Sequence, residues 1–78
     1  MRLRYFAGAA DAAGREEQQV EGPITIGQLR ATLSAEHGPE FAGVLGRCSM
    51  LVDGVRGADD VLVADTATVD ILPPFAGG

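Results

Sequence analysis

The sequence lacks tryptophan, lysine and asparagine, and it contains a single cysteine, Cys48. One cysteine cannot form a disulfide within the chain, so no oxidising compartment is implied. Six arginines stand against eleven acidic residues, the net charge is −5, and no segment gathers the arginines into a basic stripe. We therefore expect neither nucleic acid nor an anionic membrane as a partner. The acidic surface either suits a partner with a basic docking face or serves only to keep the protein soluble.

Long apolar segments are also missing. No window approaches the roughly 20 apolar residues of a membrane helix. The segment 1–17 has no apolar core of the kind that a signal peptide requires, and we predict a cytoplasmic protein. No set of cysteine, histidine and carboxylate residues has the spacing of metal ligands, so we predict no bound metal.

The length of 78 residues allows one domain. A chain of this size buries only about 60–65% of its unfolded surface, which leaves little room for a deep catalytic cleft. We therefore expect a binding or carrier module that is not catalytic alone.

Hydrophobic periodicity predicts an α+β fold. Alternating or β-branched segments predict strands at residues 2–7, 16–21 and 67–72, with a loop or weak helical turn between the first two. Ile26, Leu29 and Leu33 lie at helical spacing, so we predict a main helix over 25–37 that Thr25 caps, followed by one or two short turns. The dipeptide Asp53-Gly54 predicts a hairpin. We expect the order β-β-α-β-β-β, a mixed sheet packed on one main helix, and the last strand beside the first.

Two large apolar residues fall on the polar side of their strands. Phe6 has the parity of Arg2 and Arg4, and Leu72 has the parity of Asp70. If the first and last strands are neighbours, Phe6 and Leu72 form an exposed patch of the kind that marks a protein interface. The alternative is a bulge that returns either residue to the core.

The C-terminal residues have an unusual composition. Pro73 and Pro74 cannot donate to a central strand and instead hold the chain extended. Gly77 and Gly78 have no Cβ, so they can pass through a narrow channel and bring a terminal carboxylate into another protein's active site. The most economical activation of that carboxylate is attack on a nucleotide's α-phosphate to form a mixed anhydride.

With its opening segment YFAGAADAAG and its ending ILPPFAGG, the whole chain resembles the ubiquitin-like β-grasp sulfur carriers, in particular the MoaD-type small subunit of molybdopterin synthase. The resemblance implies a β-grasp domain over residues 1–73 and a flexible, reactive Gly-Gly tail over residues 74–78. It also implies docking roles for residues at the end of the sheet and in the tail, namely Phe6, Leu72, Pro73, Pro74, Phe75 and Ala76. Arg56 stands at a third docking position that is usually apolar in the family, which suggests an ion pair with this chain's own partner.

The same resemblance implies a mechanism. An activating enzyme related to ubiquitin-activating enzymes would adenylate Gly78 with ATP and magnesium, and a sulfurtransferase would convert it to a thiocarboxylate. No cofactor would be bound by the chain itself. The charged carrier would then donate sulfur to cyclic pyranopterin monophosphate inside the large catalytic subunit of molybdopterin synthase.

Three alternatives remain beside this interpretation: a sulfur carrier for thiamine or cysteine biosynthesis, a protein modifier joined through an isopeptide bond, and an interaction domain without chemistry. Two reactive side chains have simpler roles. We predict that Cys48 is a buried structural thiol, because its parity matches Met50. His37 falls at a helix C-terminus, where we expect it to complement the helix dipole.

Overall fold

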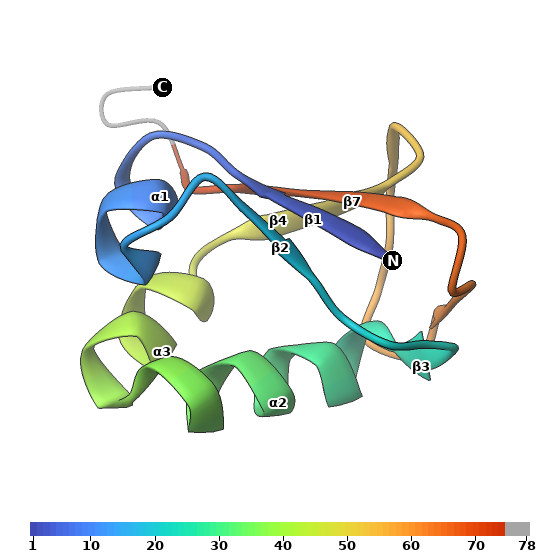
Figure 1. The fold of residues 1–78 in the computed structure, drawn as a ribbon, viewed down its shortest axis with the longest axis horizontal. Helices are drawn as coiled ribbons and strands as arrows, with labels where there is room; N and C mark the ends of the chain where they lie inside the picture. Colours follow the sequence, from blue (N-terminus) through green and yellow to red (C-terminus); the bar gives the residue numbers. More distant parts are fainter. Residues whose placement is uncertain (75–78) are drawn as a thin grey trace.

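The computed structural model describes residues 1–74. Along the chain, a five-stranded sheet is built from strands β1 (Arg2–Tyr5), β2 (Glu17–Gln19), β4 (Ser49–Val52), β5 (Val55–Arg56) and β7 (Thr68–Leu72). Helices α1 (Gly8–Ala13), α2 (Ile26–His37) and α3 (Pro39–Leu45) complete the main layers, and α2 and α3 lie together beneath one face of the sheet (Figure 1). The predicted α+β class is confirmed.

The first and last strands lie side by side at the centre of the sheet, whose order is β2-β1-β7-β4-β5. Strands β1 and β7 are parallel, with Tyr5 opposite Ile71, whereas β4 pairs with β7 in the antiparallel sense. The sheet is therefore mixed, as predicted. Because β1 and β7 run in the same direction, they end at the same edge of the molecule, immediately before Pro73.

Helix α2 begins and ends where its sequence signals predict. Thr25 and Gln28 form a capping box: the Gln28 backbone N–H donates to the Thr25 hydroxyl, and the Thr25 N–H donates to the Gln28 side chain. The helix ends at His37, and Gly38 follows with a φ of 95°, a backbone conformation that favours glycine. The capping box thus defines the start of the helix, and Gly38 defines its end.

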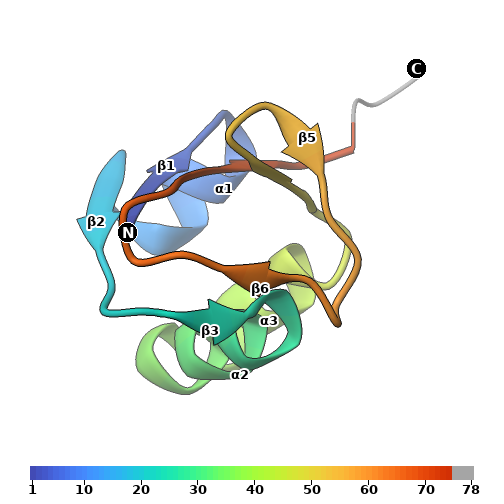
Figure 2. The ribbon, with the colours of Figure 1, turned by 90° about the vertical axis from the view of Figure 1, so that its right-hand side faces the viewer.

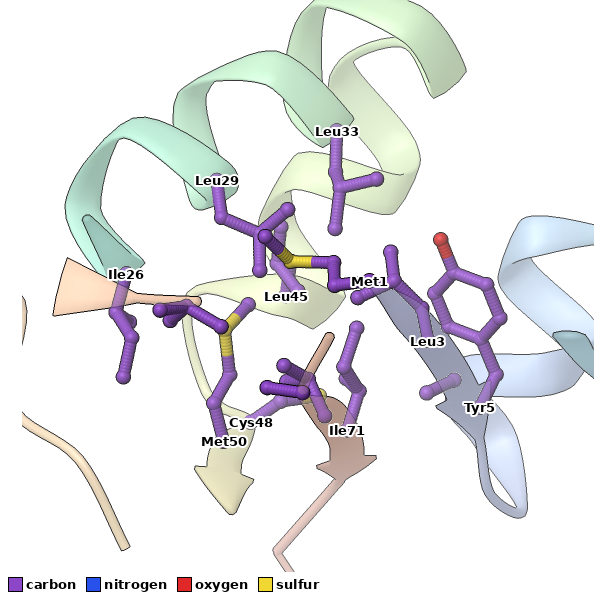
Figure 3. Close-up of a cluster of buried hydrophobic side chains, with 14 of the residues drawn as sticks. Met1, Leu3, Tyr5, Ile26, Leu29, Leu33, Leu45, Cys48, Met50 and Ile71 are labelled. Atoms are coloured by element: carbon purple, nitrogen blue, oxygen red, sulfur yellow. The ribbon is translucent and has the colours of Figure 1, made fainter. Parts of the chain in front are cut away.

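The core lies between the inner face of the sheet and helices α2 and α3 (Figure 3). Strand residues of one parity point into it, so that Leu3, Val69 and Ile71 are fully buried. They pack against a helical layer made of Ile26, Leu29, Leu33, Phe41 and Leu45. Residues of the opposite parity therefore form the outer face of the sheet, away from the helices.

The structure also contains elements that the sequence patterns did not predict. Residues 8–13 form a six-residue helix rather than a loop or a weak turn. Strands β3 (Ile24–Thr25) and β6 (Leu62–Val63) pair as a separate two-stranded sheet (Figure 2). Two-residue strands are too short to show alternation, and their pairing joins segments that are distant in sequence.

Candidate functional site: the outer face at the end of the central strands

Phe6 and Leu72 lie at the shared end of β1 and β7. The backbone N–H of Phe6 donates to the carbonyl of Ile71 at 3.2 Å, which ties the two strands together at this end. The neighbours Tyr5 and Ile71 point into the core, whereas Phe6 is 39% exposed and Leu72 is half-buried. The predicted exposure is confirmed for Phe6 and only in part for Leu72, and the alternative of a bulge that returns one of them to the core is wrong.

A third apolar residue, Leu51 on β4, belongs to the same face. Leu51 is directly opposite Asp70, and Leu72 is directly opposite Ser49, two residues before Leu51. Cross-strand partners share a face of the sheet, and diagonal neighbours remain within reach of large side chains. We call the set Phe6, Leu51 and Leu72 the Phe6 surface. The sequence patterns did not identify Leu51, because parity along β4 indicates only the face on which it lies, whereas its position beside Leu72 depends on strand pairing.

An ion pair lies beside the Phe6 surface. The Arg4 guanidinium donates to both carboxylate oxygens of Asp70, at 2.6 and 2.9 Å, in the bidentate geometry that is strongest for such pairs. The pair raises the pKa of Arg4 above its ordinary value. The same guanidinium lies 5.7 Å from the centre of the Phe6 ring. Arg4 therefore contacts the phenyl ring from a position that Asp70 fixes.

Register places Arg56 in the same row of the outer face. Four residues in register form one row across the sheet: Arg4 on β1, Asp70 on β7, Leu51 on β4 and Arg56 on β5. Arg56 is exposed. Of the sequence-predicted docking residues, the fold thus brings Phe6, Leu72 and Arg56 to one face.

The prolines lie where a docking tail would leave the domain. Strand β7 ends at Leu72, and neither Pro73 nor Pro74 extends it. Pro73 is half-buried and Pro74 is exposed. The other predicted site residues, Phe75, Ala76, Gly77 and Gly78, lie outside the described residues, so their roles and the domain boundary at residue 74 stay predictions.

Cys48 is buried, as predicted, at 5% exposure. Its thiol donates to the carbonyl of Val44 at 3.2 Å, and burial raises the pKa of Cys48, which favours the thiol over the reactive thiolate. Cys48 therefore has a structural role.

His37 is the last residue of α2, but its side chain does not cap the helix. The C-terminal hydrogen bond runs from the Gly38 N–H to the Ser34 carbonyl. The imidazole instead packs against Phe41, with ring centres 4.7 Å apart, and lies 3.1 Å from the side-chain oxygen of Gln18. Its principal role is to join α2 to the sheet edge.

Within residues 1–74, no helix is long and apolar enough to cross a membrane, and no three metal-binding side chains converge.

A surface hollow of ≈ 420 Å³ borders the Phe6 surface and is lined in part by Phe6, Ala7 and Ala10. The site is thus a mixed apolar and charged surface at one end of the sheet. Exposed apolar residues beside charged ones are typical of protein–protein interfaces.

The fold and this surface define a class, the ubiquitin-like β-grasp proteins, in which a mixed sheet packs on a main helix. More narrowly, the chain belongs to the ThiS family, whose model matches residues 3–78. It is 28% identical, over 86 residues, to the molybdopterin synthase sulfur carrier subunit of Emericella nidulans, and the match covers 97% of this chain and 94% of that protein.

Solved structures agree with this assignment of the fold. SAMP1 from Haloferax volcanii superposes with a TM-score of 0.77 at 25% identity, covering 100% of this chain and 98% of SAMP1. A chain from the complex of subunits 1 and 2 of molybdopterin-converting factor from Helicobacter pylori superposes with a TM-score of 0.70 at 20% identity. That match covers 99% of this chain and 96% of the other.

Proposed function

We propose that this protein is the sulfur carrier subunit of molybdopterin synthase, and that the C-terminal carboxylate of Gly78 is its reactive group. The observation that carries the proposal is the position of the Phe6 surface, which lies at the common end of β1 and β7, directly before Pro73. A partner that binds this surface is placed where the C-terminal tail, residues 74–78, leaves the domain. The similarity to a sulfur carrier subunit over 97% of the chain supports the same conclusion.

The chemistry takes place in three steps on Gly78. In the first, the carboxylate attacks the α-phosphate of ATP, and pyrophosphate leaves to give an acyl adenylate; magnesium balances the phosphate charge in the activating enzyme. In the second, the terminal sulfur of a sulfurtransferase persulfide attacks the acyl carbon, and AMP leaves. Reductive cleavage of the S–S bond by a thiol then yields the thiocarboxylate.

The partners follow from this sequence of steps. The activating enzyme and the large catalytic subunit each bind the Phe6 surface and receive the tail, so they bind one at a time. The Helicobacter pylori neighbour, which forms a complex of subunits 1 and 2 of molybdopterin-converting factor, supports a large subunit as a partner. Inside that subunit the thiocarboxylate transfers its sulfur to cyclic pyranopterin monophosphate.

A second candidate is a protein modifier, because the chain also resembles the small archaeal modifier protein SAMP1. In that function, the activated Gly78 would form an isopeptide bond with a lysine of another protein. The chain contains no lysine, so it cannot form lysine-linked chains with itself. The two candidates share the adenylation step and differ in the nucleophile that follows.

Intact-mass spectrometry tests the proposal. The purified protein is incubated with its cognate activating enzyme, ATP, magnesium and a sulfurtransferase, and we expect a sulfur-for-oxygen exchange located on Gly78. A variant with one alanine appended after Gly78 should lose this exchange completely, because the carboxylate is displaced by one residue, yet it should still bind the large subunit.

The remaining outcomes separate the alternatives. A thiocarboxylate that the large subunit does not consume with cyclic pyranopterin monophosphate would indicate another pathway, such as thiamine or cysteine biosynthesis. Isopeptide adducts on lysines, without a thiocarboxylate, would favour the modifier. An unchanged mass, with a second carrier converted in parallel, would contradict all carrier functions.

A further inference from the structure

Two of the arginines on the outer face are neutralised within the chain. Arg2 forms an ion pair with Glu17 on the neighbouring strand, and Arg4 is held by both oxygens of Asp70. Arg56, by contrast, forms no ion pair and donates no side-chain hydrogen bond within residues 1–74. Asp59 lines the same surface hollow as Arg56, but its ion pair is with Arg30. Arg56 therefore presents a positive charge on the outer face that no carboxylate of residues 1–74 contacts at ion-pair distance.

The backbone around Arg56 is held firmly against the sheet. The N–H of Gly57 donates to the Met50 carbonyl at 3.1 Å, and a Cβ added at Gly57 would collide with the Ile26 side chain in the core. Arg56 consequently projects from a fixed position opposite Leu51. The nearest carboxylate in its row, Asp70, lies two strands away, a separation of roughly 10 Å between the backbones, and is already engaged by Arg4.

A partner that covers the Phe6 surface also removes water from Arg56. Leu51 and Arg56 are direct cross-strand neighbours, so a protein seated on Leu51 and Leu72 contacts the guanidinium as well. Desolvation of an unpaired charge is unfavourable, whereas a carboxylate can satisfy a guanidinium with two parallel hydrogen bonds. A carboxylate of the partner at this point would satisfy the guanidinium, although the acidic chain as a whole favours a basic partner.

We propose that Arg56 is a specificity-determining residue that binds an aspartate or glutamate side chain of the partner protein docked on the Phe6 surface. The inference rests on the proposed function, since it takes the large catalytic subunit as the protein that docks. The pair adds a charge-selective contact to an otherwise apolar surface. Partners without an acidic group opposite Arg56 are disfavoured.

Binding of the full-length protein to its cognate large subunit, measured by calorimetry at low and high salt, tests the inference. We expect Arg56→Ala to weaken binding about tenfold and Arg56→Glu on the order of a hundredfold at low salt. Both losses should shrink in high salt, because the lost interaction is electrostatic. The unfolding temperature should not change, because Arg56 has no ion pair or side-chain hydrogen bond in the described chain.

Arg15→Ala is the matched control. It removes the same charge from the opposite edge of the sheet, next to β2, and should leave the affinity within about twofold of wild type. If the wild-type protein does not bind the large subunit at all, the proposed function fails. If it binds, and Arg56→Ala and Arg15→Ala behave alike at both salt concentrations, the inference about Arg56 is overturned while the proposed function stands.

Discussion

Phe6 lies in the proposed docking surface and outside the core. The ring is 39% exposed and lies on the outer face, so its removal leaves the core intact. We expect Phe6→Ala to weaken binding to the large subunit by about 2 kcal/mol, as for an aromatic residue at the centre of an interface. The free energy of unfolding should change by less than about 1 kcal/mol.

Leu62→Ala is the matched control for Phe6. Leu62 is 64% exposed, but it lies on β6 in the separate two-stranded sheet rather than on the outer face. Binding to the large subunit is measured by calorimetry, and stability by thermal unfolding, for both variants. Equal losses of affinity for the two variants would show that the effect of Phe6 is not local to the proposed surface.

The side chain of Tyr5, the neighbour of Phe6, points into the core. Its hydroxyl donates to the Gln18 side chain at 2.8 Å, and burial, with a smaller contribution from Glu36, raises its pKa to about 12. An unfolded tyrosine titrates near pH 10, so this residue stabilises the fold fully below about pH 10 and loses that contribution as the pH rises towards 12.

Ultraviolet absorbance can follow this ionisation directly, because the sequence contains a single tyrosine. We expect the phenolate signal of the native protein to appear about two units above that of the protein in denaturant. Circular dichroism recorded at the same pH values shows whether the fold persists. Ionisation of a still-folded protein near pH 10 would mean that Tyr5 is accessible to solvent.

At the scale of elements, Asp65 joins the loop before β3 to the loop before β7. Its carboxylate accepts a hydrogen bond from the Gly22 N–H at 2.7 Å and lies 3.5 Å from the amine of Met1. Both contacts favour the charged form and lower the pKa of Asp65, the Gly22 hydrogen bond more strongly. A carboxylate whose pKa is lowered by folding stabilises the fold at pH values above its unfolded pKa of about 4. This contribution disappears as the pH falls through the pKa of the folded state.

Asp65→Asn keeps a hydrogen-bond acceptor for Gly22 while removing the charge. We expect the variant to be less stable than the wild type at neutral pH, and the two to converge as the pH drops below about 4. Denaturant unfolding at a series of pH values gives the comparison. A stability difference that stays constant down to low pH would show that the charge of Asp65 makes no contribution.

The long elements could be predicted from the sequence, and so could the short strand β5, which follows the predicted Asp53-Gly54 turn, whereas β3 and β6 could not. Helix α2 carries several turns of periodic apolar residues and a capping box, and these local signals agree with the tertiary packing. Strands β3 and β6 have two residues each and are defined by pairing with one another. Helix α1 has alanines where periodicity would need larger apolar residues, so its burial of Ala9 depends on tertiary contacts.

At the scale of the whole molecule, some features of the candidate site could be predicted from the sequence and others could not. The parity of Phe6 and Leu72 within their own strands predicted their exposure, because alternation is a local property. The membership of Leu51 and the bidentate contact of Arg4 with Asp70 depend on the register between strands, which no single segment specifies. Arg56 was found by resemblance, but its lack of an ion-pair partner among residues 1–74 is visible only once the sheet is assembled.

The insertion of β7 between β1 and β4 has a consequence for the order of events in the cell. The centre of the sheet is completed by residues 68–72, which are the last described strand to leave the ribosome. Until they are in place, Leu3 and Met50 lack the neighbours that bury them, and Phe6 has no Leu72 beside it. A partly made chain therefore cannot display the assembled Phe6 surface. An activating enzyme that must bind this surface before it reacts would adenylate only folded molecules. ATP would then not be consumed on incomplete chains.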